Sequence, residues 1–527
     1  MAGFLDVLLR GLMLSGGALA LGGVVFLRVV LRAGPGPAPD AVALRSLRLV
    51  ALGAGVAAAA QLALALVALG AIVSDLGAGA VAAFARTPFV LVCAARIALA
   101  LATIALARRV ARGPAGALAW TLLGGAAGLL VASSAAISHA AARMDARATL
   151  MGLDAVHQLA AAAWTGGLVH VLGSLHTATG GARASWDAVR RFSTVALVSV
   201  ATLVAAGVAL AVAYIGDAGA LIGTAYGVMV LTKAVLLAAV LALASASFRL
   251  VRRAATSAAP VRLARLVEVE AGLLVTVLFA AASLTSVPPA TDVHADRASA
   301  AEVAARFTAM PPRLASPDVG ELLRQTNPLA GGPETRLRIE REWSEFNHHW
   351  AGLFVLAMGF AAAAHQAGVR ALRHWPLLLV GLALFLVVRN DPEVWPLGPI
   401  GFWESLAQPE VFQHRIFMAL VTVFGLFEWA VHLGRLPARP WAYVFPVLCA
   451  AGGGLLLTHS HAVFSLKEAF LMEVTHAPIG IFGAFAGWAR WLELRLPEAA
   501  PVARRVWPVC LVAVGVVLLF YSEGGPP

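Results

Sequence analysis

The segment from Ser193 to Ile215 reads STVALVSVATLVAAGVALAVAYI and contains no charged side chain. A helix of about 20 mostly apolar residues crosses the hydrocarbon core of a bilayer, so this segment is long enough to span a membrane. The sequence predicts fourteen such spans, at 4–31, 49–72, 87–107, 114–138, 150–172, 193–215, 220–248, 266–287, 348–369, 375–389, 411–432, 441–457, 466–489 and 506–521. The tenth and the last are short, which leaves twelve or thirteen spans as an alternative. The predicted fold is an all-α, polytopic bundle of membrane helices.

The composition supports this class of protein. Of the 527 residues, 60% are hydrophobic and 13% are charged, whereas an average soluble domain carries about 25% charged residues. The net charge of +11 comes from arginine clusters between apolar runs, a pattern typical of cytoplasmic membrane loops rather than of a nucleic-acid-binding face. The three cysteines stand alone and indicate neither a disulfide framework nor a thiolate zinc site. Nucleotide-binding and hydrolase motifs are missing, so we expect no enzyme.

The distribution of arginine predicts the orientation and the domains. Arginines gather in one set of alternate loops, which the positive-inside rule assigns to the cytoplasm. Both termini are then expected on the periplasmic side of a cell inner membrane. A proline-rich polar stretch interrupts the spans after residue 288. We therefore expect an eight-helix membrane domain at 1–288, a periplasmic loop at 289–347 and a six-helix, histidine-rich membrane domain at 348–527.

A first candidate metal site lies at the outer ends of the fourth and fifth spans. His139 ends the fourth span, and Asp154 and His157 open the fifth at an i,i+3 spacing on one helical face. Asp154 would orient the imidazole of His157 so that the second ring nitrogen faces a metal. Met144 and Met151 lie in or beside the adjacent loop, and thioether with imidazole favours copper, Cu(I) in particular. The alternative is that both histidines are interfacial and bonded to water or backbone.

Several motifs follow in this half of the chain, namely HQLAAAAWTGGL at 157–168, RRFS at 190–193, TAYG at 224–227, then Lys233 and Glu270. Together they resemble the copper resistance protein D family of bacterial inner-membrane proteins, over residues 139–289. The resemblance implies an eight-helix copper-handling unit that moves copper ions across the inner membrane. It also implies that His157 and Trp164 are site residues and that Lys233 and Glu270 are packing or coupling charges.

Lys233 lies about two turns into the seventh span, where its cation must be paired or reach the interface. By depth, Asp154 is the nearer acidic partner, whereas Glu270 requires a bend or a water molecule. Either an ion pair fixes helix packing here, or these groups couple transport to protons. On the second interpretation Asp154, Trp164, Lys233 and Glu270 are gating or coupling residues.

A second candidate metal site lies at the outer face of the C-terminal domain, where imidazoles from three helix ends are expected to converge: His348, His349, His414, His459, His461 and His476. Such a set suits Cu(II) or zinc. The alternative is that histidine is simply common at membrane interfaces. We expect copper as the bound ion and a periplasmic copper-binding protein as a partner besides the lipid bilayer, with no role for nucleic acid.

The same histidines also fit two other classes of protein. His349 and His414 lie at the outer ends of two spans, and His365 and His432 at their inner ends. An outer pair, His349 with His414, and an inner pair, His365 with His432, could each ligate the iron of one b-type haem, as in a membrane electron-transfer protein. A third class is a non-transporting partner that delivers copper to another protein.

Overall fold

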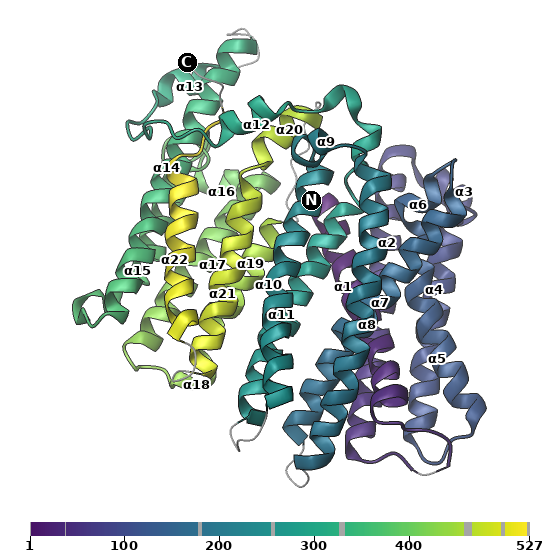
Figure 1. Cartoon of the computed structure of the whole chain (residues 1–527). Coiled ribbons are helices and arrows are strands. Elements are labelled where there is room, and N and C mark those ends of the chain that lie inside the picture. Colours follow the sequence, from purple (N-terminus) through teal and green to yellow (C-terminus); the bar gives the residue numbers. More distant parts are fainter. Residues whose placement is uncertain are drawn as a thin grey trace. The chain divides into compact units, whose positions relative to one another are not determined.

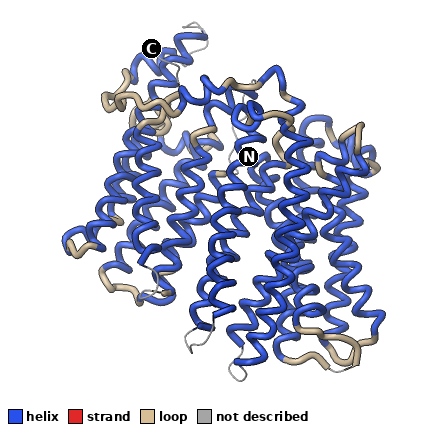
Figure 2. Tube along the Cα trace, in the orientation of Figure 1, coloured by secondary structure: helices blue, strands red, loops and turns tan. Residues whose placement is uncertain are grey.

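The computed structural model describes residues 2–36, 38–177, 182–253, 259–325, 333–457, 466–496 and 501–523. Within these ranges every regular element is a helix, and the β pairing consists of one isolated bridge between Val394 and Ile400 (Figure 2). The predicted all-α fold is confirmed over this part of the chain.

The chain divides into two compact units. Unit 1 comprises the described residues up to Arg297, and unit 2 comprises those from Ala298 onward. The expected periplasmic loop at 289–347 is thus shared between the units, with its first residues in unit 1. The domain boundaries at 288 and 348 stay a prediction.

Unit 1 is a bundle of long helices with short connecting helices (Figure 1). Its elements are α1 (Ala2–Val25), η1 (Phe26–Val30), α2 (Ala41–Leu76), η2 (Ala78–Ala80), α3 (Val81–Ala85), α4 (Pro88–Ala111), α5 (Ala117–Ala132), η3 (Ser133–Ile137), α6 (His139–Ala142), α7 (Arg147–Thr177), α8 (Ala182–Ile215), α9 (Ala218–Gly223), α10 (Ala225–Arg253), α11 (Ala259–Leu284), η4 (Ala290–Asp292) and η5 (His294–Asp296). Local sequence sets several starts: the Asp40 carboxylate accepts from Ala43 N, and Thr87 caps α4 just before Pro88.

Helix α1 is the central helix of unit 1, packing against α2, α5, α7 and α11. Its contact with α7 is very close. A Cβ atom on Gly166 would lie 1.7 Å from the carbonyl oxygen of Ala18, and one on Gly22 would lie 2.3 Å from the nitrogen of Gly167. Only glycine fits at such a crossing, and small residues at helix contacts are typical of membrane bundles. This crossing fixes α7, which carries the candidate residues His157 and Trp164.

Unit 2 contains the remaining helices. They are α12 (Ala300–Arg306), α13 (Val319–Gln325), α14 (Pro333–Gln366), η6 (Arg370–His374), α15 (Leu377–Arg389), α16 (Phe402–Ser405), α17 (Pro409–His432), α18 (Ala438–Trp441), α19 (Val444–Leu456), α20 (Leu466–Glu473), α21 (His476–Arg495) and α22 (Pro501–Leu519). The main packing pairs are α14 with α22, α19 with α21, α21 with α22, and α15 with α17.

Ten helices of the described residues are long and apolar enough to cross a membrane, so this is a multi-pass membrane protein. They coincide with ten of the fourteen predicted spans. The other four are also helical: 375–389 and 441–457 lie in the shorter apolar helices α15 and α19, and 150–172 and 348–369 lie in α7 and α14. Polar residues, histidines among them, lower the mean hydropathy of α7 and α14. The count of fourteen stays a prediction.

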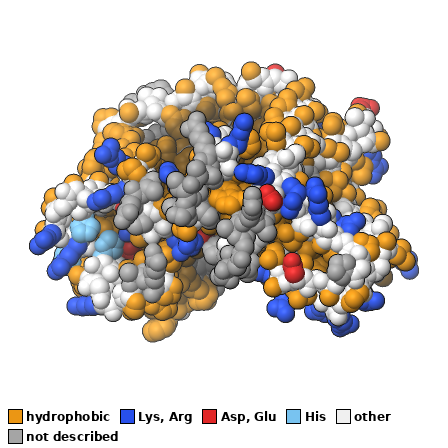
Figure 3. Space-filling model, turned by 60° about the horizontal axis from the view of Figure 1, so that its bottom comes forward, with side chains coloured by type: hydrophobic (Ala, Val, Ile, Leu, Met, Phe, Trp, Pro, Cys, Tyr) orange, Lys and Arg blue, Asp and Glu red, His pale blue; other side chains and the backbone are white. Residues whose placement is uncertain are grey.

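The helix ends that Figure 3 brings forward carry more basic than acidic side chains. Figure 3 brings forward the end at the bottom of Figure 1, and Lys and Arg are more prominent on it than Asp and Glu. The connection from η1 to α2, in dark purple, lies at this end. Under the positive-inside rule this would be the cytoplasmic end. The periplasmic position of the termini is still a prediction.

Candidate functional site

His157 lies at the contact between α7 and α8. Its Nδ1 is 3.0 Å from the carbonyl oxygen of Leu203. A carbonyl oxygen only accepts hydrogen bonds, so Nδ1 carries the hydrogen and Nε2 bears the lone pair. Histidines that bind metals commonly donate their other ring N–H to a carbonyl or carboxylate in this way. The imidazole of His157 is therefore held in a tautomer suited to ligating an ion through Nε2.

Asp154 does not orient His157 as the sequence predicted. Its Oδ1 accepts a hydrogen bond of 3.0 Å from the Nε2 of Gln158, and the carbonyl of Leu203 takes the expected role. The difference arises because α8 packs so closely on α7 that its backbone reaches the imidazole first. Asp154 is the acidic group that interacts electrostatically with Lys233.

A cavity of about 340 Å³ lies in unit 1 beside His157. Its lining includes His157, Met13, Trp164, Lys233 and Arg96, and most of its other side chains are aliphatic. Met13 of α1 is 5% exposed and supplies a thioether to the same cavity as the imidazole. We call this space the outer cavity, because His157 and Lys233 come from the halves of α7 and α10 that are predicted to face the periplasm.

A second space of about 410 Å³, the inner cavity, is lined by the opposite halves of α7 and α10 together with α8 and α11. Glu270, Ser247 and Arg249 are among its polar lining residues. Trp164 lines both cavities, is 1% exposed, and forms a side-chain hydrogen bond with the Glu270 carboxylate. The indole thus lies between the two cavities. Glu270 contacts Trp164 rather than Lys233, which had been considered as its partner.

Arg96 of the third predicted span, for which the sequence alone allows either a packing or a lumen role, lines the outer cavity. It is 3% exposed and donates to Gln61 Oε1 at 2.7 Å, Ser134 Oγ at 2.8 Å and Ser133 Oγ at 3.0 Å. Gln61 in turn donates to the sulfur of Cys93 at 3.0 Å. An arginine within a predicted span was the available signal, since such charges usually mark a function.

The other residues predicted for the first site lie away from this cavity's lining. His139 has its Nε2 2.9 Å from the carbonyl oxygen of Leu284, and its ring packs against Tyr214 and Tyr226. Met144 is 96% exposed. The structure therefore favours Met13 over Met144 as the thioether that could act together with His157, because α1 places Met13 in the lining of the same cavity.

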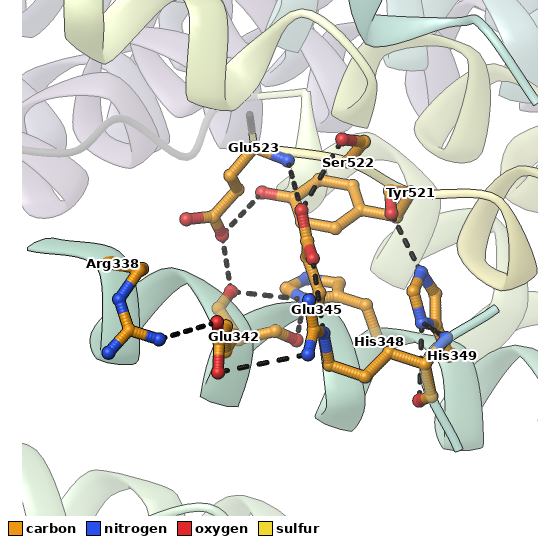
Figure 4. A network of polar contacts seen from close by, with 10 residues as sticks. Arg338, Glu342, Glu345, His348, His349, Tyr521, Ser522 and Glu523 are labelled. Atoms are coloured by element: carbon orange, nitrogen blue, oxygen red, sulfur yellow. Dashed lines mark hydrogen bonds and ion pairs between the residues drawn. The ribbon is translucent and has the colours of Figure 1, made fainter. Parts of the chain in front are cut away.

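At one end of unit 2, a polar network joins α14 to the segment after α22 (Figure 4). The ring of His348 stacks on Tyr521 with centroids 3.9 Å apart, and the ring of His476 lies 6.4 Å from each of them. Tyr521 donates to Glu523 at 2.9 Å, and burial raises the pKa of the Tyr521 phenol. Two of the predicted histidines, from α14 and α21, thus lie near one another.

The remaining histidines of the second predicted site are arranged differently. His349 accepts from Arg313 N through Nδ1 at 2.7 Å and donates to the Tyr521 carbonyl through Nε2 at 2.8 Å (Figure 4). Metal binding by His349 would require one of these bonds to break. His414 pairs with Asp391 at 2.7 Å. His459 and His461 lie outside the described residues.

Among the described residues, no group of three or more His, Cys, Asp or Glu side chains is arranged to bind a metal ion. For the haem alternative, the rings of His365 and His432, which form the predicted inner pair, have centroids 5.7 Å apart. However, the Nε2 of His432 is bound to the Glu428 carboxylate at 3.2 Å. Unit 2 therefore offers pairs of imidazoles rather than a closed site.

The comparison with protein families bears on the helices that surround the cavities. Residues 186–284 match the family described as copper resistance protein D. The matched segment holds most of α8 and all of α9 and α10, and ends with α11. It includes Leu203, Lys233 and Glu270, whereas His157 and Trp164 precede it. The resemblance to this copper resistance family is thus confirmed over this segment. No curated protein and no solved structure matches the chain.

Proposed function

We propose that this protein takes up copper ions from the periplasm and moves them across the cell inner membrane, without catalysing a reaction. One observation carries the proposal: the imidazole of His157, with its lone pair on Nε2, and the thioether of Met13 line one buried cavity. Three of the helices that line this cavity, α8, α10 and α11, lie in the segment matched by the copper resistance family. Imidazole and thioether together are ligands that favour Cu(I).

The proposed path runs from the outer cavity past Trp164 to the inner cavity. Trp164 acts as the gate, since its buried indole lines both spaces. Glu270 receives the cation beyond the gate through a carboxylate that is 3% exposed. Lys233 and Asp154 interact electrostatically at the outer side and would couple ion movement to charge or protons.

In unit 2, the outer histidines form a receiving or sensing site for copper. The proximity of His348 and His476 supports this role, because two imidazoles are enough to hold Cu(I) in a linear arrangement. His414 with Asp391, and the residues His459 and His461, would extend the site. A periplasmic copper-binding protein would deliver the ion to this face.

The test is copper uptake by the full chain reconstituted in sealed liposomes that enclose a copper-sensitive dye. We expect His157→Gln and Met13→Leu to reduce uptake by about tenfold or more, since each removes one ligand while keeping side-chain volume. His294→Ala, at an exposed histidine, and Met358→Leu, in the core of unit 2, are matched controls. Uptake equal to the unmodified protein in both ligand variants would refute the proposed site.

The same preparation separates the other two classes of protein. A delivery partner would bind copper in the liposomes without accumulating it inside. A haem protein would show a Soret absorption band. The visible spectrum is measured because His365 and His432 lie close together and could ligate a haem.

A further inference from the structure

The outer cavity of unit 1 carries an unusual charge. Arg96 and Lys233 both line it, and no Asp or Glu side chain is among the described residues that do. Most of the remaining lining is aliphatic, which gives the cavity a low dielectric environment. Two cations that line one apolar space give it a positive potential, which attracts negative charge.

The guanidinium of Arg96 is only partly satisfied by the protein. Its Nε and Nη1 atoms donate to Gln61, Ser133, Ser134 and the carbonyl of Leu130, all of which are neutral. Its Nη2 makes no hydrogen bond to any described residue. The network fixes the direction of the guanidinium at 3% exposure and leaves its charge without a counter-ion among these residues.

Lys233 also lacks a close partner in the described part of the chain. Its Nζ forms no hydrogen bond there and no ion pair within 4 Å. The acid that acts on it, Asp154, is not part of the cavity lining and has one carboxylate oxygen bonded to Gln158. A lysine ammonium in a membrane interior normally finds a paired charge or water.

We infer that the outer cavity of unit 1, which Arg96 and Lys233 both line, is a binding site for a small monovalent anion, such as chloride. A guanidinium that is held in place and a second, buried cation, in a space without competing acids, are what an anion needs in order to leave water. The hydroxyls of Ser134 and Thr165 line the same space and add neutral donors. This site goes beyond the proposed function and does not depend on copper.

The anion also bears on how copper could enter. Cu(I) with two chloride ligands carries a net charge of −1, so it would be attracted by two cations that repel the bare ion. This second step rests on the proposed function, because it supposes that copper enters the cavity at all. The anion site itself is tested without metal.

The experiment measures chloride binding to the purified, metal-free full chain from the line width of its chloride NMR signal. Saturable broadening is expected for the unmodified protein, and a decrease in affinity of about tenfold or more for Arg96→Gln and for Lys233→Gln. Arg86→Gln removes an exposed cation near α4 and should leave affinity unchanged. If Arg96→Gln does not fold, Lys233→Gln and the charge-conserving Lys233→Arg, which should retain binding, decide the question.

Two results would overturn the inference: no saturable chloride binding by the unmodified protein together with no bound fatty acid, or binding that is unchanged in both charge variants. A fatty-acid carboxylate would supply the same charge from the lipid. Native mass spectrometry of the purified chain distinguishes this source, and loss of such an acid from the two variants would equally support the anion site. Chloride binding without copper uptake would refute the proposed transport function alone.

Discussion

The Cε1 atom of His157 lies 3.0 Å from the position that a Cβ atom would occupy on Gly207. The imidazole therefore rests directly on the backbone of α8, which lets its Nδ1 reach the carbonyl of Leu203. A residue with a side chain at position 207 would separate the two helices at this point. The absence of a side chain at position 207 of α8 thus allows the hydrogen bond that fixes the tautomer of His157 on α7.

We predict that Gly207→Ala reduces copper uptake several-fold while unit 1 still folds. The added methyl group displaces the imidazole by a few tenths of an ångström and weakens its bond to Leu203. Uptake into dye-loaded liposomes measures the effect, and thermal unfolding checks the fold. Gly125→Ala is the matched control, because a Cβ there meets nothing within 4 Å. Normal uptake by Gly207→Ala would show that the position of His157 is unimportant.

The gate is tested at Trp164. Trp164→Ala should join the two cavities, of about 340 and 410 Å³, and produce a passive leak of copper or protons across liposome membranes. Truncating a buried tryptophan also costs roughly 3–5 kcal/mol of stability, so the melting temperature should fall. Trp164→Phe keeps an aromatic ring but loses the N–H that bonds Glu270, and should leak less. If liposomes that contain Trp164→Ala remain impermeable to copper and protons, Trp164 is not a gate. Trp120→Phe, in the core of unit 1, is the control for leakage caused by a general loss of packing.

The metal content of unit 2 distinguishes copper from haem. If His348 and His476 hold copper, the purified protein should be free of a Soret band, and its copper-to-protein ratio should fall in His348→Ala and in His476→Ala. His365→Ala should leave that ratio unchanged, since His365 lies in the other histidine pair, with His432. A Soret band that disappears in His432→Ala would instead establish haem at the inner pair. Elemental analysis and a visible spectrum of one sample give both answers.

Acid should loosen α12 from α20. The ammonium of Lys467 lies 2.6 Å from Glu302 and, with the hydrogen bonds from Ser299, lowers the pKa of that carboxyl from 4.5 to about 2. A carboxyl whose pKa is lower in the folded state stabilises the contact above its ordinary pKa and loses this effect as the pH falls through the folded value. The protection of α12 amides from hydrogen exchange, relative to their intrinsic exchange rate, should therefore decrease as the pH falls from about 4.5 toward 2.

A substitution checks the origin of that pH effect. Lys467→Gln should give α12 faster hydrogen exchange at neutral pH and a weaker dependence on acid, whereas Lys467→Arg should preserve both. The effect should be modest and should shrink at high salt, because both side chains are partly exposed to water. An acid response that is the same in Lys467→Gln would assign it to the helix cap at Ser299 instead.

The helices themselves were predictable because their signals are local. An uninterrupted apolar run of the required length specifies a membrane helix wherever the neighbours lie, and α8 follows directly from the segment 193–215. The i,i+3 spacing of Asp154 and His157 likewise placed both on one face of α7. The family motifs pointed to the helices that line the cavities, from α8 to α11.

Contacts between helices were not predictable in the same way. Asp154 is His157's neighbour along the helix, yet the carbonyl of Leu203, from another helix, orients the imidazole. Met13 and Arg96 join the same cavity from α1 and α4, although neither stands near a recognisable motif. Backbone carbonyls occur at every residue, so no sequence pattern marks the one that will act.

The sequence by itself determined that this is an all-helical, multi-pass membrane protein with fourteen histidines and a segment similar to the copper resistance protein D family. The tertiary structure decided which of those histidines shares a cavity with a thioether and two cations, and which is tied to backbone at both nitrogens. The physical reason is the helix crossing: it depends on where glycines such as Gly166 let two backbones meet, and a shift of one turn would bring together a different set of side chains.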